Sequence, residues 1–381
     1  MTDSSLKFVY FATVVTFCSL YAAQPIQPYF QTEFHLSDFQ AILFTTLMMA
    51  PLGIAPLVYG YLLESFSARL MVRWALFFLG TLEIIFAMAE SYSSLLAIRA
   101  LQGLMIPAIL TSLMSYISYS SKEEKVQHAI AAYIAATILG GFLGRFLSGL
   151  FTDLFGWRFF FVLLGLLLFL NCYLLKGMTR DVKMKYTRPK PGEIIALLRQ
   201  KEFFWLYATI FCLFFVFAAM MNFLPFELKK IAPASGEAGI GLLYLGYSMG
   251  IIVSLNSRKI IQRFGHETDA IAAGIGLFFL GLLFFMVGSY SVMFVGMFVF
   301  CAGLFTAHSL LSGFVNTLAK DTKAIANGLY ICFYYMGGTL GSVLPGVVFQ
   351  RYGWRMFLVQ LMLMLVLAFV FTRFLKKVTH G

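Results

Sequence analysis

Apolar stretches long enough to cross a lipid bilayer recur along the whole chain of 381 residues. A membrane-spanning helix needs about 20 apolar residues, and with short connections each span occupies about 30 residues. The sequence therefore predicts an all-α membrane protein with roughly twelve transmembrane helices. The expected spans are 8–28, 40–62, 70–90, 94–116, 127–150, 157–176, 203–224, 237–256, 268–288, 291–314, 324–348 and 354–374.

The composition excludes the main alternative classes. Hydrophobic residues make up 60% of the chain and charged residues only 12%, whereas soluble domains carry about 25% charged residues. So few charges cannot cover the surface of a water-soluble protein of this size. The sequence also lacks a GxxxxGKS/T phosphate-binding loop, so any work is expected to be driven by a gradient or by substrate binding.

The basic residues predict the orientation in the membrane. The net charge is +11, and most of the 28 Lys and Arg residues fall in connections on one side of the predicted spans. They are densest between Lys176 and Lys201. The positive-inside rule makes this side cytoplasmic and places both termini there, in the inner membrane of a bacterium. The basic balance therefore predicts topology and no nucleic-acid partner.

No motif indicates an enzyme or a cofactor. The five cysteines all lie within predicted spans, and their spacing suggests neither a metal site nor a disulfide, so we expect them to be packing residues. We find no metal-ligand cluster and no nucleophile beside a base in an aqueous loop. We expect no cofactor, with a proton gradient as the energy source.

The chain contains an internal repeat. Residues 140–160 and 337–357 match at a constant offset of 197, including Gly140 with Gly337 and Gly144 with Gly341. One six-helix unit has therefore been duplicated in parallel orientation. We expect an N-terminal bundle over 1–176, a cytoplasmic linker over 177–202 and a C-terminal bundle over 203–381. Parallel six-helix halves are typical of transporters whose halves rock about a midplane site.

The linker and the matched glycines have expected structural roles. Ile194, Leu197 and Leu198 would share one face of a short amphipathic helix on the cytoplasmic leaflet. The four matched glycines have the small-xxx-small spacing that lets membrane helices approach closely.

Three motifs carry a family resemblance. GYLLESFSAR follows the second predicted span, R-x-x-Q-G occurs at Arg99, Gln102 and Gly103, and the fifth span contains LGGFLG. With these motifs the whole chain resembles the major facilitator superfamily. The resemblance implies two pseudo-symmetric six-helix bundles. It also implies a cytoplasmic gate formed by Gly60, Glu64 and Arg69.

Finer segments resemble one branch of that family. QPIQP at 24–28, GRFLSG at 144–149, AHSLLSGF at 307–314 and ICFYYMGG at 331–338 are similar to segments of the acriflavine-sensitivity and arabinose-efflux-permease-like exporters. The resemblance implies proton-coupled export, and the last segment offers Tyr334 and Tyr335 as substrate contacts.

Charged side chains inside the spans are candidates for proton coupling. Glu83, Arg99 and Arg145 are all expected roughly 10 Å below the outer membrane face, which predicts a buried charge cluster. Glu83 would either carry protons or serve as a static partner that makes the buried arginines tolerable. Arg99 would gate protons, contact anions or act structurally.

Other polar side chains are candidates for proton coupling, substrate contact or gating. His308 is the only histidine within a predicted span, and it would either titrate or pack. Gln24, Gln27 and Asn222 lie beside prolines near the outer ends of the first and seventh spans, and they would contact substrate, a gate or another helix. Gln102 is a further candidate for substrate contact or gating.

The predicted function is secondary active transport by alternating access, most concretely the proton-coupled export of small amphipathic or polar organic compounds. A uniporter or an organic-anion carrier is the alternative within transport. A ligand sensor that keeps the transporter fold without moving its ligand is the alternative from another class. The expected partners are the lipid bilayer, a small-molecule substrate and protons, and we expect a monomer.

Overall fold

The computed structural model describes residues 3–54, 67–120, 123–177, 191–319 and 322–380. Every regular element in these residues is a helix, as the apolar pattern predicts. In chain order they are α1 (Asp3–Tyr21), α2 (Gln27–Glu33), α3 (Asp38–Met49), η1 (Ala50–Gly53), α5 (Ala68–Met88), α6 (Tyr92–Ser120), α7 (Glu123–Phe155), α8 (Trp157–Leu174), η2 (Leu175–Gly177), α9 (Pro191–Arg199), α10 (Lys201–Ile231), η3 (Pro233–Ser235), α11 (Gly236–Leu243), η4 (Tyr244–Tyr247), α12 (Ser248–Leu255), α13 (Ser257–Phe264), α14 (Glu267–Phe284), α15 (Tyr290–Leu318), α16 (Lys323–Val343) and α17 (Pro345–His380).

The described residues account for most of the predicted spans. Nine helical segments in them are long and apolar enough to cross a membrane. The first predicted span corresponds to α1, whose apolar part, Leu6–Tyr21, is shorter. The second begins as α3 and η1 and continues into 55–66, outside the described residues. The eleventh corresponds to α16, which is helical but is not among the nine.

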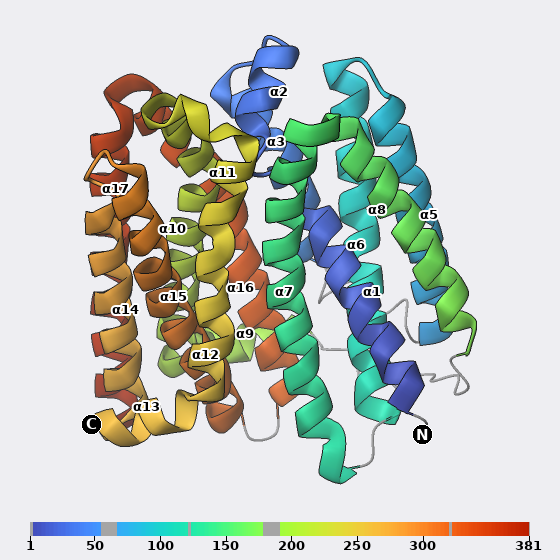
Figure 1. Ribbon diagram of the computed structural model, residues 1–381. Helices are drawn as coiled ribbons and strands as arrows, with labels where there is room; N and C mark the ends of the chain where they lie inside the picture. Colours follow the sequence, from blue (N-terminus) through green and yellow to red (C-terminus); the bar gives the residue numbers. More distant parts are fainter. Residues whose placement is uncertain (1–2, 55–66, 121–122, 178–190, 320–321, 381) are drawn as a thin grey trace. The chain divides into compact units, whose positions relative to one another are not determined.

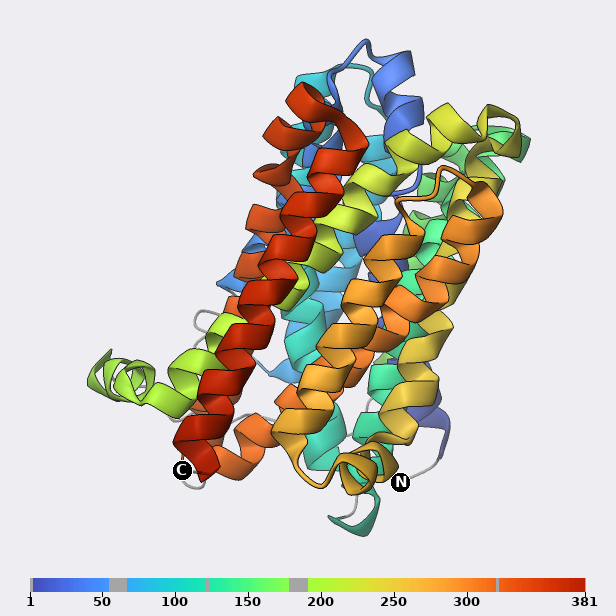
Figure 2. The same cartoon turned by 90° about the vertical axis from the view of Figure 1, so that its left-hand side faces the viewer.

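The helices form two units, each with its own packing. Unit 1 is Met1–Arg188 with Ser235–Leu242, and unit 2 is Pro189–Ala234 with Leu243–Gly381. In unit 1, α5 packs on α6 and α8, and α1 packs on α7 (Figure 1). In unit 2, α14 packs on α15, and α10 packs on α16 and α17 (Figure 2).

Residues Ser235–Leu242 belong to unit 1, although the sequence places them in the C-terminal bundle. Their attachment has a polar cause. The Asp153 carboxylate on α7 accepts hydrogen bonds from the backbone N–H groups of Glu237 and Ala238, at 3.0 and 2.8 Å. These donors lie in the first turn of α11, where backbone N–H groups have no partner within the helix.

Glycines bring α7 directly against the backbone of α1 in unit 1. A Cβ atom on Gly140 would lie 2.5 Å from the Val14 carbonyl oxygen, and one on Gly144 would lie 2.5 Å from the Cα of Cys18. Real side chains do not approach so closely, so only glycine permits this packing.

Unit 2 repeats this contact at the same offset of 197 residues. Gly337 and Gly341 on α16 pack against the backbone of Phe211 and Phe215 on α10, again with no space for a Cβ atom. Each of the four residues follows its unit 1 counterpart by 197 positions. The duplication seen in the sequence is therefore also a duplication of helix packing.

A tyrosine hydrogen bond is repeated in the same way. The Tyr10 hydroxyl donates to the Ala129 carbonyl at 3.3 Å in unit 1, and the Tyr207 hydroxyl donates to the Ala326 carbonyl at 3.0 Å in unit 2. Both donor and acceptor are shifted by 197 residues. This bond fixes the other end of the α1–α7 and α10–α16 pairs.

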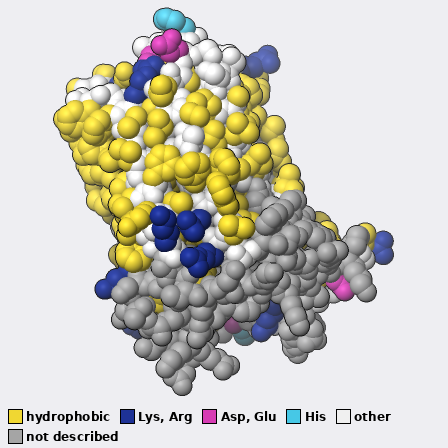
Figure 3. Space-filling view, turned by 90° about the vertical axis from the view of Figure 1, so that its right-hand side faces the viewer, with side chains coloured by type: hydrophobic (Ala, Val, Ile, Leu, Met, Phe, Trp, Pro, Cys, Tyr) yellow, Lys and Arg dark blue, Asp and Glu magenta, His cyan; other side chains and the backbone are white. Residues whose placement is uncertain are grey.

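The face of unit 1 on the side of α5 and α8 has the apolar surface expected next to lipid. Figure 3 shows apolar side chains across the face on the side of α5 and α8, with Lys and Arg side chains gathered below them. Large apolar side chains on these two helices remain exposed, among them Trp74, Phe77, Phe78, Leu166 and Leu170. A contiguous apolar surface of this kind needs a nonaqueous neighbour.

The glycine packing generates a prediction about stability. Gly144→Ala should lower the free energy of unfolding by about 1–3 kcal/mol, because the methyl group overlaps the backbone of α1. The measurement is thermal unfolding of the purified protein in detergent. Gly276→Ala on α14 is the matched control, since nothing lies within 4 Å of its Cβ position. Equal effects of the two substitutions would contradict the proposed role of Gly144.

Candidate functional site

A completely buried carboxylate lies in the middle of unit 1. Glu83 on α5 has no exposed surface. The Ser19 hydroxyl on α1 donates a hydrogen bond to its Oε1 atom. Its Oε2 atom is also buried and has no hydrogen-bond partner in the described part of the chain. A buried carboxylate with one unpartnered oxygen is costly unless a cation or a proton compensates it.

Arg99 on α6 supplies a positive charge that acts on Glu83. Its side chain is fully buried and interacts electrostatically with Glu83. Its Nε atom donates to the Phe44 carbonyl and its Nη1 atom donates to Gln102 Oε1, both at 2.9 Å. The guanidinium also lies 5.2 Å from the centre of the Phe86 ring.

This cluster keeps unused hydrogen-bonding capacity. Arg99 Nη2 and Gln102 Nε2 are buried and, like Glu83 Oε2, have no partner among the described residues. Two donors and one acceptor therefore lie unpaired within one buried group. Buried polar atoms usually have partners, so three unsatisfied atoms in one cluster need an explanation, such as an ordered water, an ion or a catalytic role.

Arg145 on α7 has a different set of partners. It is 1% exposed, and its Nε atom donates to Gln24 Oε1 at 2.7 Å. Its Nη1 atom donates to the Gly141 carbonyl at 2.6 Å, and the guanidinium lies 3.8 Å from the centre of the Tyr21 ring. The three predicted charges are thus all buried in unit 1: Glu83 interacts electrostatically with Arg99, whereas Arg145 contacts Tyr21 at the end of α1 and Gln24 just beyond it.

The remaining amide candidates are buried and take part in hydrogen bonds between helices. Gln27, in the first turn of α2, donates from Nε2 to the Thr45 hydroxyl on α3 at 2.9 Å. Asn222 on α10 donates from Nδ2 to the Ser342 hydroxyl on α16 at 2.7 Å. These bonds favour the helix-to-helix alternative for both residues.

His308 on α15 belongs to an aromatic cluster in unit 2. Its Nδ1 atom lies 2.8 Å from the Tyr330 hydroxyl oxygen, and that hydroxyl donates to the His308 carbonyl at 3.2 Å. The Tyr334 ring lies 4.9 Å from the imidazole ring, centre to centre. Of these three side chains, His308 and Tyr334 are partly exposed and Tyr330 is buried.

Tyr334 and Tyr335 on α16 continue this cluster towards α10. The Tyr334 ring stacks on Phe214 with centres 3.6 Å apart, and Tyr335 meets Tyr334 edge to face at 5.0 Å. Tyr335 is also partly exposed. The arrangement is an aromatic wall of stacked and tilted rings with a hydroxyl and an imidazole at its edge.

The predicted cytoplasmic gate lies only partly within the described residues. Gly60 and Glu64 fall outside them. Arg69, at the start of α5, donates from Nη2 to the Lys176 carbonyl in η2 at 2.9 Å. Among the described residues, no group of three or more His, Cys, Asp or Glu side chains is placed to hold a metal ion.

Sequence reasoning missed several partners of the candidate residues. They are Ser19, Tyr21, Thr45, Tyr330 and Ser342. Small hydroxyl groups are common in apolar spans, where they bond to the backbone of their own helix. Only the facing helix distinguishes the ones that bind another side chain, and that information is absent from a single sequence.

The Glu83–Arg99 arrangement predicts non-additive effects on stability. Arg99→Met leaves a buried carboxylate without its cation, and Glu83→Gln leaves a buried guanidinium without its anion. The double variant contains neither charge. It should therefore be more stable than the sum of the single effects predicts, by about 1–3 kcal/mol in a thermal unfolding cycle. Additive effects would contradict a coupled pair.

Comparisons with known proteins agree with this architecture. The family model for the Major Facilitator Superfamily matches residues 9–319. The inner membrane transport protein YnfM of Escherichia coli (strain K12) is 29% identical over 375 residues, covering 97% of this chain and 90% of that protein. The uncharacterized MFS-type transporter YybF of Bacillus subtilis (strain 168) is 24% identical, covering 92% and 88%.

Solved structures show the same fold. The crystal structure of the nucleoside transporter NupG matches with a TM-score of 0.82 at 12% identity, over 97% of this chain and 99% of that chain. A bacterial homolog of the human lysosomal transporter Spinster, in an inward-facing and unoccupied conformation, matches with a TM-score of 0.75 at 14% identity, over 99% of both chains. The family match and the repeated helix packing together identify this chain as a multi-pass membrane protein of the major facilitator superfamily of transporters.

Proposed function

We propose that the protein is a proton-coupled exporter of small amphipathic or polar organic compounds in the bacterial inner membrane, with both termini cytoplasmic. The observation that carries the coupling is the completely buried carboxyl group of Glu83 among Ser19, Arg99 and Gln102. A carboxyl group in such a place can bind or release a proton as its neighbours rearrange.

The mechanism follows from the two states that this carboxyl group can adopt. When Glu83 is ionised, Arg99 compensates its charge. When Glu83 is protonated, Arg99 loses this electrostatic partner and keeps its hydrogen bonds to the Phe44 carbonyl and Gln102. Proton binding therefore alters the forces between α5 and α6, and this change would bias the alternating access expected of the family.

The partly exposed aromatic wall of unit 2 supports the choice of substrate class. Tyr334, Tyr335 and His308 offer π faces and polar edges, and flat amphipathic cations bind to such surfaces. In this scheme unit 1 contributes the proton site and unit 2 contributes substrate contacts.

An organic-anion carrier is the second candidate function. The observation that favours it is that two guanidinium groups, those of Arg99 and Arg145, are buried in unit 1. An anionic substrate would pair with an arginine, and in that case export would not require a proton at Glu83.

The coupling proposal predicts a specific loss of export. Cells that lack other exporters should accumulate less ethidium or acriflavine when they contain the protein, and a protonophore should abolish the difference. Glu83→Gln should raise accumulation to the level of cells without the protein, because it cannot exchange a proton. Glu90→Gln, an exposed position just beyond α5, is the matched control and should export normally.

Purified protein in liposomes separates the two parts of this proposal. Glu83→Gln should still exchange substrate across the membrane without a gradient, while losing proton-driven accumulation. Full gradient-driven transport by Glu83→Gln would overturn the role of Glu83. If the unaltered protein does not export dyes, the assignment of dyes as substrates is wrong. Organic anions and sugars would then be tested next.

The aromatic wall generates a prediction about substrate affinity. Tyr334→Leu should raise the KM for a planar cationic dye by roughly 3–10-fold through the loss of one stacking partner, whereas Tyr334→Phe should change it little. Tyr352→Leu is the control, because Tyr352 is 61% exposed and lies outside the cluster. Initial rates of dye export, measured over a range of dye concentrations, give the KM of each variant. An unchanged KM in Tyr334→Leu would contradict the assignment.

A further inference from the structure

A groove with basic and aromatic walls lies at one end of unit 2. It is lined by the C-terminal end of α9, the first turns of α10 and the last turns of α17, and its volume is about 530 Å³. Three cations (Arg199, Lys201 and Lys377) and three aromatic residues (Phe204, Trp205 and Phe374) line it. In Figure 2, α9 turns away from the body of the unit beside the end of α17.

The aromatic side of the groove is exposed, unlike the aromatic side chains of the core. Phe204 is 52% exposed and Phe374 is 45% exposed. Trp205 stacks on Phe374 with ring centres 4.9 Å apart. Tryptophan is enriched where membrane helices meet the headgroup region, because its ring is apolar and its N–H is polar. The groove therefore has an apolar side continuous with a lipid-facing helix surface.

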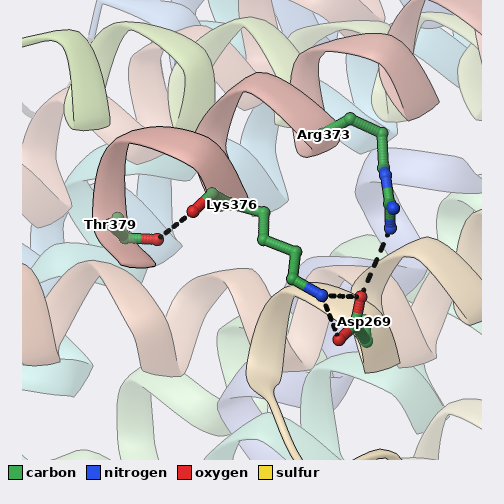
Figure 4. Close-up of polar contacts among 4 residues, drawn as sticks. All are labelled: Asp269, Arg373, Lys376 and Thr379. Carbon is green, nitrogen blue, oxygen red and sulfur yellow. Dashed lines mark hydrogen bonds and ion pairs between the residues drawn. The ribbon is translucent and has the colours of Figure 1, made fainter. Parts of the chain in front are cut away.

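The cations in the groove differ from other basic residues on α17. Arg373 and Lys376 turn towards Asp269 on α14 and form ion pairs at 3.3 and 2.6 Å (Figure 4). Lys377, the next residue, lines the groove instead. No acidic side chain lines the groove, and its three cations form no ion pair in the described part of the chain.

We propose that this groove binds an anionic diacyl phospholipid, with its phosphate between the three cations and an acyl chain along Phe204 and Phe374. Charge complementarity selects the anionic headgroup, and basic pockets between transmembrane helices bind such headgroups. The exposed aromatic side of the groove selects a lipid over a free anion, since an inorganic phosphate would leave these rings uncovered. This site is independent of the proposed transport reaction.

Trp205 lies within the groove and reports binding directly. The purified full-length protein in non-ionic detergent is titrated with phosphatidylglycerol carrying brominated acyl chains, and quenching of tryptophan fluorescence is recorded. Comparison with Trp205→Phe isolates the contribution of this residue. We expect phosphatidylglycerol to bind at least about tenfold more tightly than brominated phosphatidylcholine, because several cations contribute to its binding.

Variants test the origin of this preference. Lys201→Gln with Lys377→Gln should reduce the preference to less than about twofold. Lys259→Gln with Arg263→Gln on α13 removes equal charge outside the groove and should leave the preference intact. Lys201→Arg with Lys377→Arg should also retain it, which separates loss of charge from misfolding.

Three results would overturn the proposal. They are equal quenching by the two lipids, loss of the preference in the α13 control as well, and displacement of brominated phosphatidylglycerol by millimolar inorganic phosphate. The last result would identify a site for free anions in place of a lipid site.

Discussion

The close contact between α1 and α7 positions the polar chemistry of unit 1. Cys18 packs on Gly144, so the neighbours of both residues are held at the same level of the bundle. Ser19, next to Cys18, reaches Glu83, and Arg145, next to Gly144, reaches Gln24. A side chain at position 144 would separate the two helices and disrupt these contacts together, because helix separation affects every pair along the seam.

The repeat preserves packing while the chemistry differs. The glycine contacts and the tyrosine hydrogen bond recur after 197 residues, so the backbone frame is common to both units. At the position of Arg145, however, unit 2 has Ser342, which accepts a hydrogen bond from Asn222. Unit 1 thus has a buried guanidinium where unit 2 has a neutral hydroxyl. A buried charge is expensive to maintain in a membrane, so this asymmetry supports a functional role for unit 1.

Much of the fold follows from the sequence, because the length and apolarity of its segments predict the membrane helices. The helical class, the duplication and the glycine seams were all predictable. Counting residues from the membrane face predicts that Glu83, Arg99 and Arg145 lie at one level, and the structure shows that all three are buried in unit 1. The count gives the height of a residue along its helix but does not specify which neighbour its side chain faces. Ser19 and Tyr330 were therefore missed as partners.

Helix α1 links the two buried arginine clusters physically. Ser19 holds Glu83, while Tyr21 and Gln24, about one turn further along the chain, hold Arg145. Because these side chains are attached to one short segment, a rotation or tilt of α1 alters the partners of both clusters in the same step. Each buried charge then needs a new partner, and under the proposed coupling a proton at Glu83 would be the mobile one. Protonation of Glu83 would therefore act on Arg145 through α1. Helix α1 would move along its close contact with Gly140 and Gly144 on α7.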